Sequence, residues 1–192
     1  MNLILASQSP RRKELLSSLG YEYEALPADI DESVGTDTES IYVPEIIARK
    51  KALAVLEKRR DCVVLGSDTV VICDGKILGK PSDKEEAKLM LRLLSGKKHV
   101  VATGVCVCDK NQTRSFVSVT DVYFHPLSDE LIEEYAATNE PLDKAGAYGI
   151  QGAGSVLVKK IDGDYFTVMG LPVAQAARLL AEFGIYGKFL NF

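Results

Sequence analysis

A continuous apolar run from Cys62 to Ile72 constrains the fold of this chain more than any other stretch. Its sequence, CVVLGSDTVVI, has the length and the β-branched content of a strand that is buried on both faces. Asp68 stands in a Gly-Ser-Asp-Thr patch at its centre. A buried carboxylate is destabilising unless it is paired, hydrogen-bonded or bound to a metal, so Asp68 predicts a functional site. The alternative is that the strand breaks at Gly66, which would place Asp68 in a turn.

The pair Asp74-Gly75 follows this run and is the two-residue turn signal of a β-hairpin. In such a hairpin the returning strand brings Lys80 opposite residues near Thr69. The ammonium group of Lys80 would then lie close enough to the Asp68 carboxylate for both to serve one ligand.

The N-terminal residues 3–16 form a short apolar stretch that leads directly into a helix start. Ser9 suits the N-cap and Pro10 the first helical position. Three basic residues then occupy positions 11–13, where the helix dipole disfavours cations. Free N–H groups, the Ser7 and Ser9 hydroxyls and two arginines make this turn a candidate phosphate cradle, although it lacks the Gly-rich Walker sequence. The alternative is a solvated basic helix end.

A helix is expected from Tyr42 to about Arg60, because its apolar residues have helical spacing. Lys50 and Lys51 cannot both lie on its solvated face, since successive helical residues are about 100° apart. One of them is therefore free to point inward. In the polar segment before this helix, Asp31 and Glu32 are candidate metal ligands, and solvated loop acids are the alternative.

Residues 141–154 contain four glycines within nine positions, which allows the backbone to approach a ligand closely. Asp143, Lys144 and Gln151 supply donors and acceptors of the kind that read a base or bind phosphate. A flexible linker is the alternative, but Ala, Tyr and Ile among the glycines are not typical of one.

The rest of the chain alternates strand and helix patterns. We expect one hairpin from residues 99–108 and 113–124, and a last hairpin from residues 156–161 and 165–169. No internal repeat, dinucleotide fingerprint or P-loop is present. The 192 residues, 46% of them apolar, predict a single mixed α/β domain whose middle can form a second lobe.

Charge and cysteine usage exclude several classes of protein. The net charge of −4 and the dispersed basic residues argue against a nucleic-acid scaffold or an anionic membrane partner. No signal-peptide pattern or membrane-spanning run is found, so we expect a cytoplasmic location. The four cysteines form no CxxC pair and there are two histidines, which makes a zinc site unexpected. Cys106 and Cys108 are expected to be small buried hydrophobes on one strand face, with redox use as the alternative.

Together these segments resemble one family, the Maf (septum formation inhibitor-like) nucleoside triphosphate pyrophosphatases. The resemblance spans nearly the whole chain. It rests on LASQSPRR at residues 5–12, GSDT at 66–69, LGKP at 78–81, LSG at 94–96, DKAGAYGIQG at 143–152 and GLP at 170–172. The family commonly has GADT where this chain has GSDT, which exchanges one small residue for another.

The resemblance implies an elongated, two-lobed α/β fold like that of inosine triphosphatase, with a cleft between the lobes and often a homodimer. It implies hydrolysis of a nucleoside triphosphate between the α and β phosphorus atoms, with Mg²⁺ or Mn²⁺. The family is linked to the removal of unwanted nucleotides and to cell-division arrest. Arg12, Thr69 and Gln151 together resemble the group that acts on dTTP and UTP.

The resemblance implies the role of proton acceptor for Asp68, and the chemistry of the other side chains suggests their roles independently. Asp68 corresponds to the proton acceptor, and with Glu32 it is expected to hold the metal. Cations and hydroxyls that suit phosphate oxygens are expected to bind the substrate: Ser7, Ser9, Arg11, Arg12, Lys51 and Lys80. Gln151 offers an amide donor and acceptor that complement uracil or thymine.

A non-enzymatic nucleotide sensor that regulates a division partner is the main alternative from another class. Such a sensor needs cations and base contacts, but a buried carboxylate beside an anionic ligand repels phosphate unless a metal bridges the two. Asp68 therefore favours the enzyme.

Overall fold

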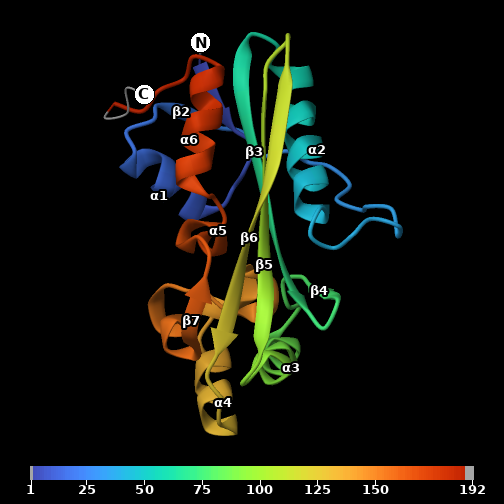
Figure 1. Cartoon of the computed structure of the whole chain (residues 1–192), viewed down its shortest axis with the longest axis vertical. Coiled ribbons are helices and arrows are strands. Elements are labelled where there is room, and N and C mark those ends of the chain that lie inside the picture. Colours follow the sequence, from blue (N-terminus) through green and yellow to red (C-terminus); the bar gives the residue numbers. More distant parts are fainter. Residues whose placement is uncertain (1, 189–192) are drawn as a thin grey trace.

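The computed structural model describes residues 2–188 and contains one seven-stranded mixed sheet with helices on both faces (Figure 1). The strands are β1 (Asn2–Leu5), β2 (Tyr23–Ala25), β3 (Cys62–Cys73), β4 (Lys76–Leu78), β5 (Lys98–Cys108), β6 (Thr113–Phe124) and β7 (Val158–Asp162). The helices are α1 (Pro10–Ser18), α2 (Val43–Lys58), α3 (Lys84–Leu94), α4 (Asp129–Ala137), α5 (Tyr165–Met169) and α6 (Val173–Glu182). Three short 3₁₀ segments, η1 (Glu140–Asp143), η2 (Ala145–Ala147) and η3 (Gly152–Leu157), lie between α4 and β7.

The sheet has the strand order β2-β1-β3-β5-β6-β7, and β4 pairs with β3 outside this path. β1 is parallel to both β2 and β3, whereas the remaining pairs are antiparallel. The three long strands β3, β5 and β6 run through the whole elongated molecule and connect its two ends (Figure 1). The predicted mixed α/β fold and the predicted hairpins of β3 with β4 and of β5 with β6 are confirmed.

β3 is continuous through Gly66 and Asp68, so the alternative in which the strand breaks at Gly66 is wrong. Asp68 pairs with Gly104 of β5 in a regular antiparallel register. Both glycines are needed because α2 passes very close to the sheet. A Cβ atom on Gly66 would lie 2.3 Å from the carbonyl oxygen of Ala48, and one on Gly104 would lie 2.2 Å from the amide nitrogen of Glu45. The contact with the helix backbone, not a bulge, therefore explains the glycine in the strand.

The two ends of the molecule have separate cores on the same long strands. At one end, α2 covers one face of the sheet while α1 and α6 cover the other (Figure 1). At the other end, α3 and α4 pack with η2 and η3 on the sheet. Cys106 and Cys108 are fully buried in the core under α2 and carry free thiols, as expected from their spacing.

The last predicted hairpin is wrong in its second half. Residues 158–162 form β7, which pairs with β6, but Tyr165–Met169 is the helix α5 instead of a strand. The carboxylate of Asp164 caps this helix by accepting a hydrogen bond of 2.8 Å from the amide of Thr167. Gly170, with φ of 102°, ends it in the left-handed region. The N-cap Asp164 and the C-cap Gly170 are only six residues apart, and they favour a short helix although the apolar pattern is typical of a strand.

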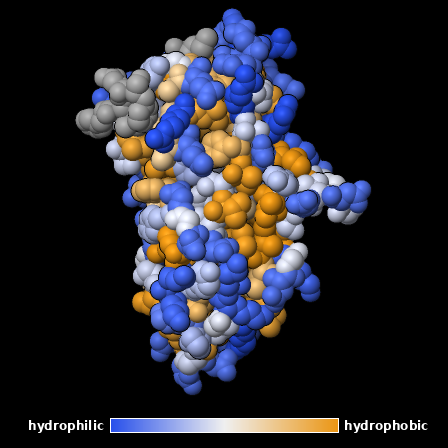
Figure 2. Space-filling view, in the orientation of Figure 1, coloured by the Kyte–Doolittle hydropathy of each residue, from blue (hydrophilic) through white to orange (hydrophobic). Residues whose placement is uncertain are grey.

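Hydrophobic side chains gather on the middle of the sheet, beside the N-terminal end of α2, where no helix covers the strands (Figure 2). Val70, Ile72 and Ala102 form a small cluster there, with Val100 and Val117 packed against it. In residues 2–188 no helix is long and apolar enough to cross a membrane.

Candidate active site

A cleft of about 1060 Å³ lies between the two ends of the molecule. Its walls come from the β1–α1 turn, α2, β3 with the β4 turn, and the segment from η1 to η3. The cleft brings together every site residue expected from the sequence: Ser7, Ser9, Arg11, Arg12, Glu32, Lys51, Asp68, Thr69, Lys80 and Gln151. Segments more than 140 positions apart along the chain therefore meet at one site.

Lys51 is the lysine of α2 that points inward, and it binds two carboxylates. Its Nζ lies 2.7 Å from Oδ1 of Asp68 and 2.8 Å from Oε1 of Glu32. The side chains of Lys51 and Asp68 are each 13% exposed, whereas that of Glu32 is 56% exposed. Lys50 instead donates to the carbonyl oxygen of Ser33 at 2.6 Å. The buried carboxylate of Asp68 thus has the partner that its position in the strand requires.

The donor set at this point fits a hard divalent cation. Asp68 and Glu32 converge on one position that the Lys51 ammonium group touches, so a positive charge is already favoured there. Mg²⁺ is commonly bound by one or two carboxylates together with substrate phosphates and water. Among residues 2–188, at this site and everywhere else, no group of three or more His, Cys, Asp or Glu side chains could hold a metal ion by itself. These two carboxylates are therefore suited to a metal that arrives with a phosphate ligand.

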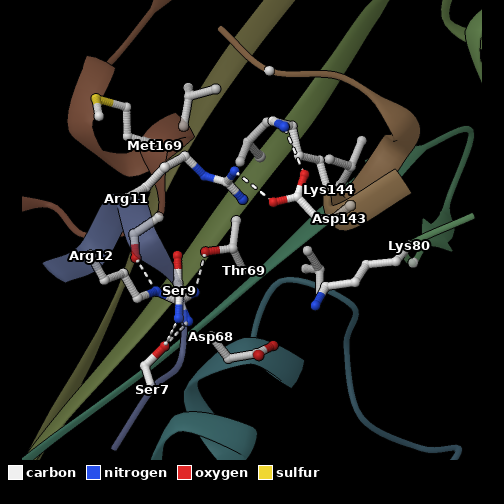
Figure 3. A pocket seen from close by; sticks show the side chains of 18 of the residues that line it. Ser7, Ser9, Arg11, Arg12, Asp68, Thr69, Lys80, Asp143, Lys144 and Met169 are labelled. Carbon is white, nitrogen blue, oxygen red and sulfur yellow. Dashed lines mark hydrogen bonds and ion pairs between the residues drawn. The ribbon is translucent and has the colours of Figure 1, made fainter. Parts of the chain in front are cut away.

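Arg12 is buried and holds three segments together. Its Nε donates to the carbonyl oxygen of Gly170 at 2.7 Å, Nη1 to Oγ of Ser7 at 3.2 Å, and Nη2 to Oγ1 of Thr69 at 3.0 Å (Figure 3). Burial lowers the pKa of Arg12 from its ordinary value, and the nearby negative charge of Asp68 opposes this shift. Three of the five N–H groups of the guanidinium are used by the protein, which leaves two for a ligand.

Arg11 is more exposed and reaches the opposite wall of the cleft. Its Nη1 lies 3.2 Å from Oδ2 of Asp143 in η1, and the other oxygen of Asp143 accepts from Nζ of Lys144 at 2.7 Å (Figure 3). Burial pushes the pKa of Asp143 up, but the bonds to Lys144 and Arg11 outweigh it and hold that pKa below its ordinary value. Arg11 therefore links the two walls of the cleft, and it lies where an anion could compete with Asp143 for it.

The β1–α1 turn and the β4 turn present the remaining polar groups. Ser9 occupies the N-cap of α1 but makes no side-chain capping bond, and its amide donates to Oγ of Ser7 at 3.2 Å. Pro10 occupies the first turn as predicted. Lys80 lies beyond the end of β4 and its amino group points into the cleft, toward Asp68 (Figure 3). The hairpin thus places Lys80 and Asp68 at one cleft, as the turn signal predicted.

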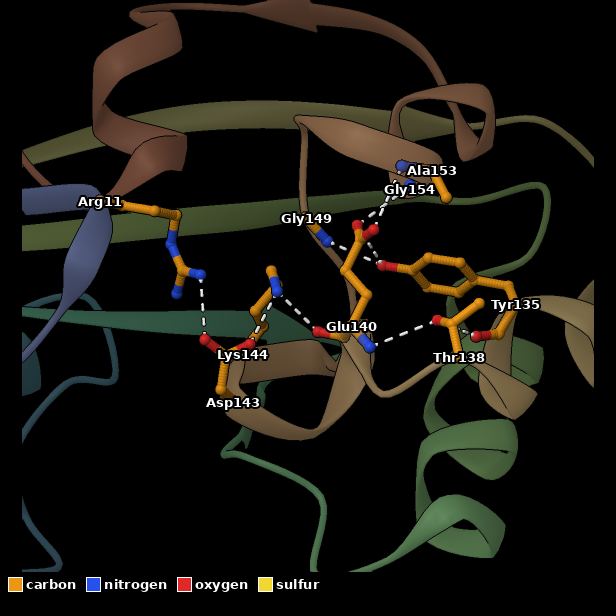
Figure 4. Close-up of polar contacts among 9 residues, drawn as sticks. All are labelled: Arg11, Tyr135, Thr138, Glu140, Asp143, Lys144, Gly149, Ala153 and Gly154. Carbon is orange, nitrogen blue, oxygen red and sulfur yellow. Dashed lines mark hydrogen bonds and ion pairs between the residues drawn. The ribbon is translucent and has the colours of Figure 1, made fainter. Parts of the chain in front are cut away.

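The glycine-rich segment is anchored and is not a flexible linker (Figure 4). The carboxylate of Glu140 accepts hydrogen bonds of 3.2 Å from the amides of Ala153 and Gly154. Oη of Tyr135 donates to the same carboxylate at 3.1 Å and accepts from the amide of Gly149 at 3.2 Å. These bonds fix the backbone on both sides of Gln151, an exposed residue that lines the cleft.

The family model of the Maf-like proteins matches residues 2–183 of the chain. This chain belongs to the Maf family. Among curated relatives it is 49% identical over 183 residues to the dTTP/UTP pyrophosphatase of Bacillus pumilus (strain SAFR-032), covering 95% of this chain and 97% of that protein. It is 50% identical over 183 residues to the dTTP/UTP pyrophosphatase of Bacillus velezensis (strain DSM 23117 / BGSC 10A6 / LMG 26770 / FZB42), with coverage of 95% and 97%.

Among solved structures, a HAM1 protein from Coxiella burnetii has a similar fold, with a TM-score of 0.50 and 15% sequence identity. The match covers 95% of this chain and 99% of that one. At this identity the comparison concerns the fold alone. It agrees with the elongated architecture described above for this Maf-family chain.

Two polar residues of this Maf-family site were missed by the reasoning from sequence. Glu140 precedes the glycine-rich segment and looks like an ordinary surface acid until its five hydrogen-bonded partners are seen together. Thr103 is a fully buried hydroxyl in β5, where it binds Thr69. A polar residue between Ala102 and Gly104 in an apolar strand was the one available signal for it.

Proposed function

We propose that this chain hydrolyses dTTP and UTP, and related pyrimidine nucleoside triphosphates, to the nucleoside monophosphate and pyrophosphate. The observation that carries the proposal is the carboxylate of Asp68, 13% exposed, in a cleft that also presents the cationic side chains of two arginines and three lysines. The names of the Bacillus relatives, at 49% and 50% identity over nearly the full length, support the same substrates. Removal of unwanted nucleotides, with a link to cell-division arrest, is the physiological role that we propose.

In this proposal Asp68 takes a proton from a water molecule that attacks a phosphorus atom of the α–β phosphoanhydride, and the bridging P–O bond breaks to release the monophosphate and pyrophosphate. Lys51 orients this carboxylate by its bond of 2.7 Å and supplies a positive charge beside it. Arg11, Arg12 and Lys80 bind phosphate oxygens together with the Ser7 and Ser9 hydroxyls and the N-terminal end of α1. Phosphoryl transfer requires this kind of positioning and charge neutralisation more than covalent catalysis.

We propose that Asp68 and Glu32 hold Mg²⁺ or Mn²⁺ when the nucleotide is bound. The cation would supply positive charge beside the phosphate oxygens and so reduce their repulsion of the incoming water. Glu32 is well placed to switch from Lys51 to a cation, because its side chain is exposed and its ion pair lies at the solvent edge of the cleft.

Phosphorus NMR tests the proposal directly. With dTTP or UTP and Mg²⁺ or Mn²⁺, we expect signals of the monophosphate and of pyrophosphate. Release of orthophosphate with a nucleoside diphosphate would overturn the assignment of the cleaved bond. Tight binding of UTP without any cleavage would favour the nucleotide sensor instead.

We further propose a homodimer that covers the apolar patch on the middle of the sheet. Val119, 43% exposed, pairs with Ala102 of the cluster, and Ile77, 39% exposed, pairs with its Ile72. Such contiguous apolar surface is typical of an interface. Light scattering after gel filtration should give twice the chain mass, and Val119→Lys should give the monomer. A cytoplasmic location stays a prediction.

A further inference from the structure

A chain of hydrogen bonds leads from the cleft into the interior of the protein. Nη2 of Arg12 lies 3.0 Å from Oγ1 of Thr69, which lies 2.9 Å from Oγ1 of Thr103. Oγ1 of Thr103 in turn lies 2.7 Å from the backbone carbonyl oxygen of Thr167 in α5. Thr69 lines the cleft, whereas Thr103 is fully buried.

The direction of every bond in this chain follows from the groups at its two ends. A guanidinium group only donates, so Arg12 donates to Thr69. A carbonyl oxygen only accepts, so the proton in the contact of 2.7 Å belongs to the hydroxyl of Thr103. The single hydroxyl proton of Thr103 is therefore used. The bond of 2.9 Å between the two threonines must then be donated by Thr69.

The hydroxyl of Thr69 can therefore make only one kind of hydrogen bond with a ligand. A threonine hydroxyl has one proton and two lone pairs. Its proton is committed to Thr103 and one lone pair to Arg12, so a single lone pair remains. Toward the cleft, Thr69 can accept a hydrogen bond but cannot donate one without breaking the buried chain.

We propose that Thr103 is a positioning residue which makes Thr69 an acceptor and thereby selects nucleotides whose base presents an N–H donor. Uracil and thymine carry such a donor at N3, whereas cytosine carries an acceptor there. The inference rests on the proposed function and assigns the source of its base selectivity. Thr103 itself does not line the cleft.

The rigidity of this hydrogen-bond chain allows the site to discriminate uracil from cytosine. Gln151 is exposed, and its amide can turn to offer either its donor or its acceptor, so alone it would serve uracil and cytosine alike. Thr69 has no such freedom, because both of its partners are buried and Arg12 is itself fixed by Gly170 and Ser7. A cytosine ring would place a lone pair against the lone pair of Thr69 and leave both unsatisfied.

The decisive substitution is Thr103→Val, which keeps the shape of the side chain and removes its oxygen. The carbonyl of Thr167 keeps a partner, because it also accepts from the amide of Gly170 at 3.1 Å. The proton of Thr69 then loses its acceptor and is free to turn toward the cleft. Thr103→Ser retains the hydroxyl and is the conservative variant. Thr120→Val is the matched control. The Thr120 side chain is equally buried, and its hydroxyl binds Asp164 and takes no part in the hydrogen-bond chain from Arg12 to Thr167.

The experiment compares UTP with CTP in two ways: kcat/KM with Mg²⁺, and the dissociation constant by calorimetry in EDTA. We expect Thr103→Val to reduce the preference for UTP at least about tenfold, chiefly through a lower KM and Kd for CTP, with kcat for UTP little changed. Thr103→Ser and Thr120→Val should keep the wild-type preference. Circular dichroism of each variant establishes that it is folded. If Thr103→Val does not fold, Thr103→Ala replaces it, and we expect the same loss of preference for UTP.

An unchanged preference in folded Thr103→Val would overturn the inference, as would an equal loss in Thr120→Val. The two measurements also separate this inference from the proposed function. If the wild-type protein cleaves neither UTP nor dTTP, the proposed function fails. The ratio of the two dissociation constants still tests the role of Thr103.

Discussion

The ammonium nitrogen of Lys51 lies 2.7 Å from Oδ1 of Asp68 and 2.8 Å from Oε1 of Glu32. This cation pairs with the carboxylate of Asp68, which without a partner would strongly destabilise the long apolar strand. It also holds that carboxylate at the base of the cleft with its second oxygen available to a ligand. The same ion pair therefore stabilises the fold and prepares the proposed proton acceptor.

We expect Asp68→Asn to reduce turnover of UTP roughly 10³-fold, because an amide cannot take a proton from water. UTP should still bind, since the surrounding cations remain. Steady-state kinetics and calorimetry measure the two effects. Asp37→Asn, which changes an exposed acid before α2, is the control and should keep full activity. Unchanged turnover in Asp68→Asn would remove Asp68 from the chemistry.

Substitution of Glu140 by Gln should raise KM for UTP about tenfold with a smaller change in kcat. A glutamine side chain can accept from only one of the amides of Ala153 and Gly154, so the segment that carries Gln151 loses an anchor. The inhibition constant of tripolyphosphate, which has no base, should not change. Glu134→Gln on α4 is the matched surface control. A parallel loss of tripolyphosphate binding would mean that Glu140 supports the whole cleft and not the base contact.

The stability of the protein should fall as the pH drops from about 6.5 to about 4. His99 is 1% exposed, its Nε2 lies 2.8 Å from Oη of Tyr148, and burial lowers its pKa from 6.5 to about 4. Between these values the unfolded chain binds a proton that the folded protein does not. The unfolded state is then favoured by roughly 3 kcal/mol at the acidic end.

Urea unfolding at pH 7.5 and pH 4.5 measures this loss. His99→Asn should reduce the difference between the two pH values, whereas His125→Gln, at the other, exposed histidine, should not. An equal difference in the wild type and in His99→Asn would assign the acid sensitivity to other groups.

Gly104→Ala should lower the free energy of unfolding by about 3 kcal/mol, because the added methyl group overlaps the backbone of α2. Its Cβ would lie 2.2 Å from the amide nitrogen of Glu45 and 2.3 Å from the carbonyl carbon of Pro44. Gly35→Ala, where nothing lies within 4 Å, should be close to neutral. Thermal unfolding compares the two. Displacement of α2 would also move Lys51 from Asp68, so activity should fall together with stability in Gly104→Ala only.

Strand and helix patterns in the sequence predicted most of the elements, since apolar spacing and turn residues act locally. The exception, α5, shows where local patterns compete. Residues 165–169 have the apolar content of a strand, but Asp164 caps them and Gly170 stops them within six positions. Gly66 was similarly ambiguous, because a glycine in a strand can mark a bulge or a close contact. Only the position of Ala48 in α2 distinguishes the two.

The sequence by itself determined which residues have unusual chemistry: a carboxylate in an apolar strand, cations at a helix start and glycines among donors and acceptors. These features are visible because each is locally unfavourable without a partner. Only the tertiary structure decided the partners. It turned Lys51 and not Lys50 toward Asp68, used Arg12 to join three segments, and set Thr103 behind Thr69. Bonds between residues 17 to 158 positions apart depend on the packing of helices on the sheet, which no local pattern specifies.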